Sequence, residues 1–286
     1  MFKMNFRTKT LLACILAEVI MITTTACGTG QEAGSDKAGQ TTVSGAASSQ
    51  TAASQNTVSQ STASAAGTAG SETQTGSTTA ADNLKITESE LAMIREKAEK
   101  LPDIEGLVLV KDLDDSISID LKYATADNFT RKKVYPLAVC ALQRETAIKL
   151  CAANLALKEK GLRLKVWDAY RPLYVQQIFW DLVKDNRFVA DPATGGSIHN
   201  RGCAVDVTLV DEKGNELKMP TGFDDFSEKA YGDSADLSDK VKENLKILRT
   251  AMGKAGFFII DTEWWHFEDE DQGKFEVSDV KLEEFK

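Results

Sequence analysis

The sequence predicts an α+β fold, a single folded domain with a largely antiparallel central sheet flanked by helices. Three observations lead to this prediction. Apolar and polar residues alternate in short segments, most clearly at 162–167, as in strands with one buried face. Longer segments rich in Ala, Leu, Lys and Glu are typical of helices. Strand and helix segments are mixed, without the strict alternation that produces a parallel sheet.

The folded domain is expected to begin with a helix. Thr87, with Glu90 three residues later, forms the pattern of a capping box, and the helix would end before Pro102. Short apolar segments at 107–110 and 117–121 predict strands. The remaining elements expected, in chain order, are a helix at 138–160 closed by Gly161, a strand at 162–167, a helix at 172–184, a strand at 204–210, a helix at 238–254, and strands at 257–260 and 263–267.

Residues 1–26 have the features of a signal peptide. Basic residues precede a short apolar run at 11–22, which is too short for a comfortable membrane span. Small residues then lead to Cys27, as in bacterial lipoprotein signals, where the cysteine takes a lipid. This pattern predicts export and anchoring to the outer face of the bacterial cell membrane. Thr24 in place of the usual Leu, and Glu18 within the apolar run, keep open an ordinary secretory signal and a secreted protein.

The segment 27–84 is expected to be a tether. It consists mainly of Ser, Thr, Ala, Gly and Gln and contains no aromatic residue. Such a composition buries too little apolar surface to offset the entropy of ordering the chain. A flexible tether would lift the folded domain, expected at 85–286, away from the membrane surface.

Charge and cysteine content exclude some classes of protein. The net charge of −9 argues against a nucleic-acid partner, because phosphate binding needs a basic surface. Nothing in the sequence indicates a protein partner. The folded part has an odd number of cysteines, Cys140, Cys151 and Cys203, which is not a disulfide framework. Cys140 and Cys151, on one predicted helix, would be about 16 Å apart, so we expect small buried apolar residues.

Two histidines, His199 and His266, are the strongest candidates for chemistry. His199 and Asp206 can approach one metal ion if the chain folds back between them, and Gly202 allows such a bend. Asp206 would then lie on a strand, with its apolar neighbours facing the core. A carboxylate in that position needs a partner, and a metal ion is a suitable one.

Glu263 and His266 are three residues apart, so on a regular strand they would point to opposite faces. A turn between them would let His266 bind the metal while Glu263 faces the metal-bound water. Two histidines and one aspartate leave a tetrahedral zinc ion with an open position. Each residue alone is more often an ordinary core residue. Together they predict one zinc ion per chain, in a cleft on the sheet.

The pattern S-x-H-x-x-G-x-A-x-D, followed by E-x-W-H, resembles the zinc D,D-peptidases. Three further segments, at 123–129, 168–172 and 263–266, resemble the VanX-type D-alanyl-D-alanine dipeptidases of that family. The resemblance covers nearly all of the expected folded domain and leaves out the signal peptide and the tether. It implies zinc-dependent hydrolysis of D-alanyl-D-alanine or a similar short D-amino-acid dipeptide.

The resemblance also implies roles for individual residues. The zinc ligands would be His199, Asp206 and His266; the general base that activates water would be Glu263; the residue that stabilises the oxyanion would be Arg171; and the residues that hold the two ends of the dipeptide would be Tyr123, Ser197 and Asp224. Asp224 would pair with the substrate ammonium, although Asp225 beside it leaves the register open. Asp168 would either orient Arg171 near the substrate or serve as a turn residue.

Two other functions are compatible with parts of the sequence. A D,D-carboxypeptidase acting on longer cell-wall peptides would use the same metal and base in an open cleft. A tethered binding lipoprotein with a degenerate site is disfavoured, because ligands, base and arginine are all present. An exported enzyme cannot reach cytoplasmic wall precursors, so we expect scavenging or turnover of external dipeptides.

Overall fold

A five-stranded sheet with the order β2-β4-β5-β7-β6 lies at the centre of the computed structural model, which describes residues 84–233 and 236–285. Its strands are β2 (Ser118–Ile119), β4 (Leu162–Asp168), β5 (Ala204–Asp211), β7 (His266–Asp269) and β6 (Phe257–Ile259). β2 pairs with β4 in parallel, and the other neighbouring strands are antiparallel. The predicted α+β class with a largely antiparallel sheet is therefore confirmed.

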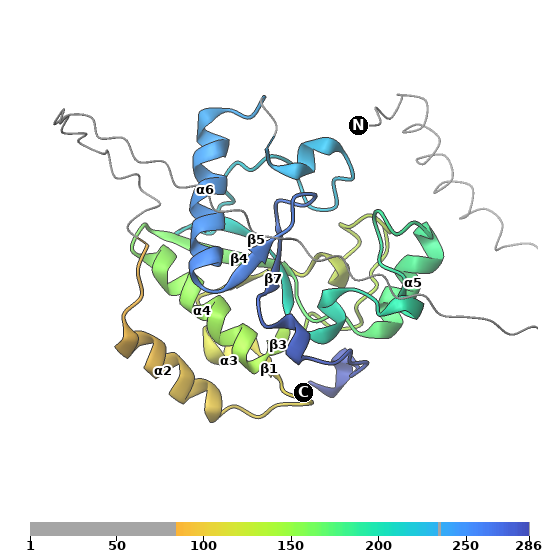
Figure 1. Cartoon of the computed structure of the whole chain (residues 1–286), viewed down its shortest axis with the longest axis horizontal. Coiled ribbons are helices and arrows are strands. Elements are labelled where there is room, and N and C mark those ends of the chain that lie inside the picture. Colours follow the sequence, from red (N-terminus) through yellow and green to blue (C-terminus); the bar gives the residue numbers. More distant parts are fainter. Residues whose placement is uncertain (1–83, 234–235, 286) are drawn as a thin grey trace, which may run out of the picture. The chain divides into compact units, whose positions relative to one another are not determined.

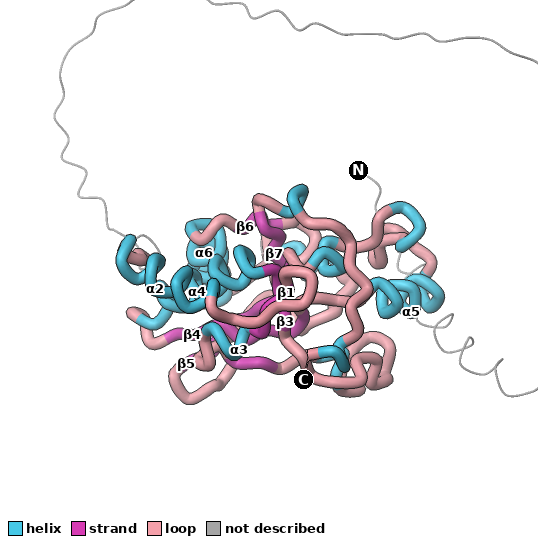
Figure 2. Tube along the Cα trace, turned by 90° about the horizontal axis from the view of Figure 1, so that it is seen from below, coloured by secondary structure: helices cyan, strands magenta, loops and turns pink. Residues whose placement is uncertain are grey.

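Helices cover the sheet. They are α2 (Glu88–Glu99), α3 (Val110–Leu113), α4 (Arg144–Lys158), α5 (Leu173–Val183) and α6 (Asp239–Lys254). Figure 1 shows α4 and α6 over β4, β5 and β7. Figure 2, seen from below, shows α2, α4 and α6 on one side of the strands and α5 on the other. The predicted capping box of α2 is present, with reciprocal bonds between Thr87 and Glu90.

Strand alternation separates the core face of the sheet from the face that carries polar groups. Val205, Val207 and Leu209 are fully buried, as the sequence predicts. Asp206 and Thr208 alternate with them and therefore point to the opposite face. A β-bulge at the end of β4 places Asp168 directly opposite Asp206. Bulges re-aim side chains in this way, and here the bulge brings two carboxylates to the same end of the sheet.

The predicted helix at 138–160 is wrong at its start. Ala141–Gln143 forms a strand, β3, which pairs antiparallel with β1 (Leu107–Leu109), and α4 begins only at Arg144. The backbone N–H of Gln143 also donates to the carbonyl of Gly202 at 2.8 Å. These long-range bonds override the local helix preference of the segment. Cys140 is thus outside the helix, although all three cysteines of the described domain are free and buried, as predicted.

The predicted signal peptide, the lipidation site Cys27 and nearly all of the predicted tether lie outside the described residues. Leu84, placed at the end of the tether by its sequence, is only 2% exposed and packs in the core. Within 84–233 and 236–285, every helix is too short or too polar to cross a membrane.

Candidate active site and metal centre

Three potential metal ligands meet at the end of the sheet. His199 lies in a short 3-10 helix, Ile198–Arg201, whose first turn is capped by the Ser197 hydroxyl. Gly202 follows with φ +69°, where a Cβ would collide with Leu107, so the predicted chain reversal occurs at a position that requires glycine. The reversed chain enters β5, in which Asp206 is the cross-strand partner of His266 in β7.

The donor atoms are spaced as ligands of one ion would be. His199 Nε2 lies 3.1 Å from His266 Nδ1 and 3.4 Å from Asp206 Oδ1, and the last two atoms are 2.9 Å apart. Ligands at about 2.0–2.1 Å from a tetrahedral zinc ion are separated by about 3.3 Å. All three side chains are buried.

The partners of the histidines direct their lone pairs toward this point. His199 Nδ1 lies 2.7 Å from the carbonyl of Ala169, which can only accept, so this nitrogen carries the proton. His266 Nε2 likewise donates to Glu268 Oε1 at 3.2 Å, and Gln272 holds the other oxygen of Glu268 at 2.8 Å. The remaining ring nitrogens and the Asp206 carboxylate face one another as acceptors. Three converging acceptors repel unless a cation lies between them, so the donor set fits a metal ion.

The pKa shifts of His266 and Asp206 also indicate a site that favours positive charge. Burial alone would lower the pKa of His266, but a proton on Nδ1, in place of a metal ion, would bond Asp206, and this bond and the one to Glu268 raise the pKa to about 10. Burial would also raise the pKa of Asp206, yet the charges and hydrogen bonds of His199 and His266 hold it well below its usual range. Both shifts show that the surroundings favour positive charge among these side chains.

A pocket of about 290 Å³ opens beside the three ligands. Glu263 lines it together with His266, because the chain turns through Trp264 and Trp265, where the N–H of His266 donates to the carbonyl of Glu263 at 3.3 Å. The predicted turn between Glu263 and His266 is therefore present. Burial raises the pKa of the Glu263 carboxyl, an effect that the neighbouring His266 opposes. A carboxyl with a raised pKa can both accept a proton and release it again.

Arg171 is held rigidly at the wall of this pocket. Its Nη2 and Nε donate to Asp168 Oδ2 at 2.8 and 3.1 Å, and its Nη1 donates to Gln176 Oε1 at 2.8 Å. Its guanidinium carbon lies 5.4 and 5.0 Å from the ring centres of Tyr123 and Phe179. Such a preorganised cation can stabilise a developing negative charge without moving.

Asp168 lies behind Arg171 and is fully buried. It accepts a short hydrogen bond of 2.6 Å from the Tyr135 hydroxyl as well as the two bonds from Arg171. The structure thus brings Asp168 to the arginine, and its Oδ2 also lies 3.8 Å from His199 Nδ1.

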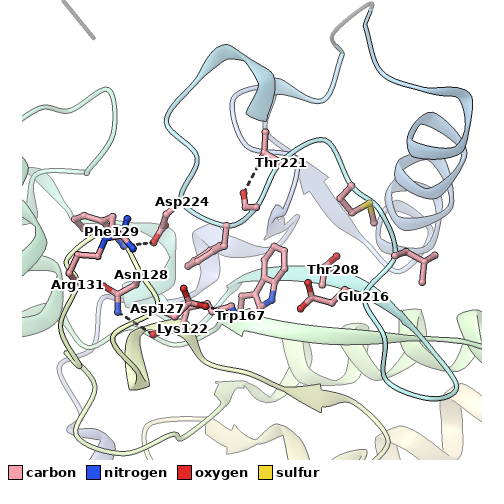
Figure 3. Close-up of a pocket in the computed structure, with 14 residues that line it drawn as sticks. Lys122, Asp127, Asn128, Phe129, Arg131, Trp167, Thr208, Glu216, Thr221 and Asp224 are labelled. Atoms are coloured by element: carbon pink, nitrogen blue, oxygen red, sulfur yellow. Dashed lines mark hydrogen bonds and ion pairs between the residues drawn. The ribbon is translucent and has the colours of Figure 1, made fainter. Parts of the chain in front are cut away.

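Asp224 also lines the pocket. Its Oδ1 accepts from the Tyr123 hydroxyl at 3.0 Å, and its Oδ2 accepts from the N–H of Phe129 at 3.2 Å (Figure 3). Burial raises the pKa of Asp224 to about 7, against the lowering effect of these two bonds. Asp225 instead accepts from the N–H of Ser227 at 2.8 Å and stays outside the pocket, whereas Ser197 lines it.

Some functional candidates were missed in the sequence. Glu268 is two residues after His266 on the same strand, so alternation alone places both side chains on one face and could have revealed it. Tyr135 carries no such local signal, because it meets Asp168 across 33 positions of the chain. Gln176 is only five residues from Arg171, but a single glutamine near the start of a helix forms no recognisable pattern.

Comparison with known proteins agrees with this geometry. A family model described as D-Ala-D-Ala dipeptidase, of the M15 peptidases, matches residues 103–285. Three similar proteins are each named D-alanyl-D-alanine dipeptidase. That of Escherichia coli (strain K12) is 40% identical over 152 residues, covering 53% of this chain and 78% of the relative. Those of Enterococcus faecium and Streptomyces coelicolor are 28% and 31% identical, covering 57% and 55% of this chain and 90% and 88% of the relatives. The chain belongs to the D-Ala-D-Ala dipeptidase family of M15 peptidases.

Proposed function

We propose that the domain hydrolyses D-alanyl-D-alanine, or a similar short D-amino-acid dipeptide, in a zinc-dependent reaction. The observation that carries the proposal is the convergence of His199 Nε2, Asp206 Oδ1 and His266 Nδ1 beside Glu263 in one small pocket. Family membership and the names of the relatives support the same reaction. Zinc held by these three side chains would supply a Lewis acid and a water of lowered pKa.

We expect the residues around the pocket to have different roles in hydrolysis. Glu263 takes a proton from the attacking water and returns it to the leaving amine, a double role that suits its raised pKa. The Arg171 guanidinium faces the negative charge that develops on the carbonyl oxygen, and Asp168 and Gln176 keep it in place. Ser197 and Tyr123 line the pocket, which supports the role expected for them, holding the two ends of the peptide.

Asp224 supports a dipeptide over a longer substrate. Its carboxyl is buried in the pocket wall, where an unpaired charge is costly. The free ammonium of a dipeptide would compensate that charge. A D,D-carboxypeptidase acting on longer peptides would place an uncharged peptide group there instead.

The test compares D-alanyl-D-alanine with its N-acetylated form. Loss of a buried ion pair costs about 3–5 kcal/mol, so kcat/KM for the acetylated peptide should fall by a factor of about 150 to 5,000. The Asp224→Asn variant should lose most of this preference, while Asp225→Asn keeps it. If acetylated or tripeptide substrates are cleaved equally well, the assignment as a dipeptidase is wrong and the carboxypeptidase activity is favoured. If the preference for the free dipeptide is lost only in Asp225→Asn, then Asp225 rather than Asp224 contacts the substrate ammonium.

For the location, we propose an exported lipoprotein attached through Cys27, with secretion as the alternative. The small residues before Cys27 and the polar segment after it support this. In a bacterial expression host, incorporation of a labelled fatty acid should depend on Cys27 and disappear in Cys27→Ser. A labelled Cys27→Ser protein would contradict the assignment. In that location the enzyme would serve scavenging or turnover of external dipeptides.

A further inference from the structure

The backbone of Arg171 is hydrogen-bonded on both sides to the turn that carries the candidate metal ligand His199. The N–H of Arg171 donates to the carbonyl of His199 at 3.1 Å. The carbonyl of Arg171 accepts from Nδ2 of Asn200, the next residue along that turn, at 2.7 Å. Both polar groups of the Arg171 backbone are therefore held by the 3-10 helix Ile198–Arg201. The point from which the arginine side chain starts is thus fixed relative to the metal ligands.

Asn200 uses both ends of its side-chain amide in this arrangement. The residue is fully buried, its Oδ1 accepts from the N–H of Ser197 at 2.7 Å, and its Nδ2 donates to the carbonyl of Arg171. The reverse orientation of the amide would set an NH₂ group against an N–H and an oxygen against a carbonyl, so the hydrogen bonds determine the orientation. Ser197 and Arg171 both line the active-site pocket. One buried side chain therefore fixes two pocket residues relative to each other.

The surroundings hold Asn200 closely. Its backbone carbonyl accepts from the N–H of Ser278, in the C-terminal segment of the domain, at 2.8 Å. The preceding loop passes the amide at Gly196, where φ is +68° and where a Cβ would collide with Asn200 Oδ1. The place of the amide is therefore set by packing and by hydrogen bonds together.

We propose that Asn200 is a positioning residue that places the Arg171 guanidinium for stabilisation of the oxyanion. The inference rests on the proposed function, in which negative charge develops on the carbonyl oxygen of the dipeptide. Asn200 does not line the pocket, so it acts on the reaction through Arg171. Asp168 and Gln176 fix the guanidinium end of the arginine, and Asn200 fixes its backbone end. A displacement of about 1 Å in a catalytic group can cost about 100-fold in rate.

Kinetics of the zinc-loaded, full-length protein with D-alanyl-D-alanine test this role. Asn200→Ala should lower kcat by about 10- to 100-fold, while KM is unchanged and the zinc is retained. Asn154→Ala is the matched control. Asn154 is also a fully buried asparagine that uses both ends of its amide, donating to Asp114 at 2.8 Å and accepting from the N–H of Leu164 at 2.9 Å, and it lies outside the pocket. This variant should lower Tm to a similar extent and leave kcat unchanged.

A double-mutant cycle separates positioning from a general structural effect. In the Arg171→Met background there is no guanidinium to place, so Asn200→Ala should lower kcat no further. A purely structural role would lower kcat by the same factor in both backgrounds. Arg171→Lys, which keeps a cation beside Asp168, provides a second background if Arg171→Met does not fold. There the loss of kcat caused by Asn200→Ala should be smaller than in the unchanged protein.

A phosphinate analogue of the dipeptide gives a measurement without turnover. Its P–O⁻ group takes the place of the oxyanion, so its Kd, measured by calorimetry, should rise in Asn200→Ala by the factor by which kcat falls. The role is overturned if Asn200→Ala keeps its kcat, if it loses its zinc, if Asn154→Ala loses as much kcat, or if the effect of Asn200→Ala is the same without the arginine. Absence of hydrolysis by the unchanged protein would count against the proposed function. Hydrolysis without coupling between Asn200 and Arg171 would count against this inference alone.

Discussion

Asp206 and His266 are direct cross-strand partners in the antiparallel pair β5–β7, and their side chains meet with Oδ1 2.9 Å from Nδ1. Two of the three candidate metal ligands are therefore positioned by backbone hydrogen bonds of the sheet. The third, His199, is fixed by the carbonyl of Ala169. A site built this way is organised before the metal arrives, unlike small domains that fold only around their metal.

This arrangement predicts that the protein binds one zinc ion and keeps its fold without it. Removal of the metal with a chelator should abolish hydrolysis but preserve the far-ultraviolet circular dichroism spectrum, and added zinc should restore activity. The His199→Ala, His266→Ala double variant should contain no stoichiometric metal by elemental analysis. Retention of one zinc ion in that variant would refute the ligand assignment.

Glu263→Gln should retain zinc and lose hydrolysis. The side chain lines the pocket beside the ligands, so the variant removes proton transfer without removing a metal donor. Loss of a general base typically costs about 10²- to 10⁴-fold in rate. Elemental analysis checks that zinc is retained, and kcat measured on the same sample checks that hydrolysis is lost. Turnover close to that of the unchanged protein, with zinc bound, would remove Glu263 from the mechanism.

Glu268 is expected to strengthen metal binding through His266. It accepts the His266 Nε2–H and is held by Gln272, so Glu268→Ala frees the ring to rotate and change its tautomer. Loss of the hydrogen-bond partner that orients a metal ligand weakens metal affinity by about 10- to 100-fold. Competition with a chromophoric chelator measures this affinity, with Glu270→Ala, just beyond the end of β7, as the control. The zinc affinity of Glu268→Gln, which keeps an acceptor oxygen, should lie between those of Glu268→Ala and Glu270→Ala. An unchanged zinc affinity in Glu268→Ala would contradict this role of Glu268.

Asp224 predicts a pH dependence of substrate binding. Its pKa is raised to about 7 by burial, so the carboxyl is neutral below that pH and charged above it. The α-amino group of a peptide loses its proton near a pKa of about 8. Pairing of the two charges is therefore best between about pH 7 and 8, and 1/KM should fall on the acid side of pH 7. In Asp224→Asn this acid limb should disappear; an unchanged profile would show that another group controls it.

Much of the metal site could be predicted because its signals are local. Gly202 and the turn between Glu263 and His266 are visible as short patterns, and both turns are present in the structure. The support of Arg171 is different. Tyr135 reaches Asp168 across 33 positions of the chain, and the rings that hold the guanidinium come from separate segments. Such contacts arise only from the packed fold.

The start of α4 shows the same limit in the backbone. Residues 141–143 have a helical composition, but their hydrogen-bonding groups are used by β1 and by the chain at Gly202. The competing partner lies more than thirty residues away in sequence, so a window around the segment cannot reveal it.

The three buried thiols of the described domain can be used to measure its transient unfolding. Cys140, Cys151 and Cys203 are unpaired and buried, and burial raises the pKa of Cys203 to about 12 and holds the pKa of the other two thiols even further above the usual range. Almost no thiolate exists in the closed protein, so an alkylating reagent can modify these positions only during transient unfolding. The modification rate at each cysteine, measured by mass spectrometry, would report how often the part of the fold around that cysteine unfolds. The ratio of these rates with and without zinc would measure how strongly metal binding is linked to folding.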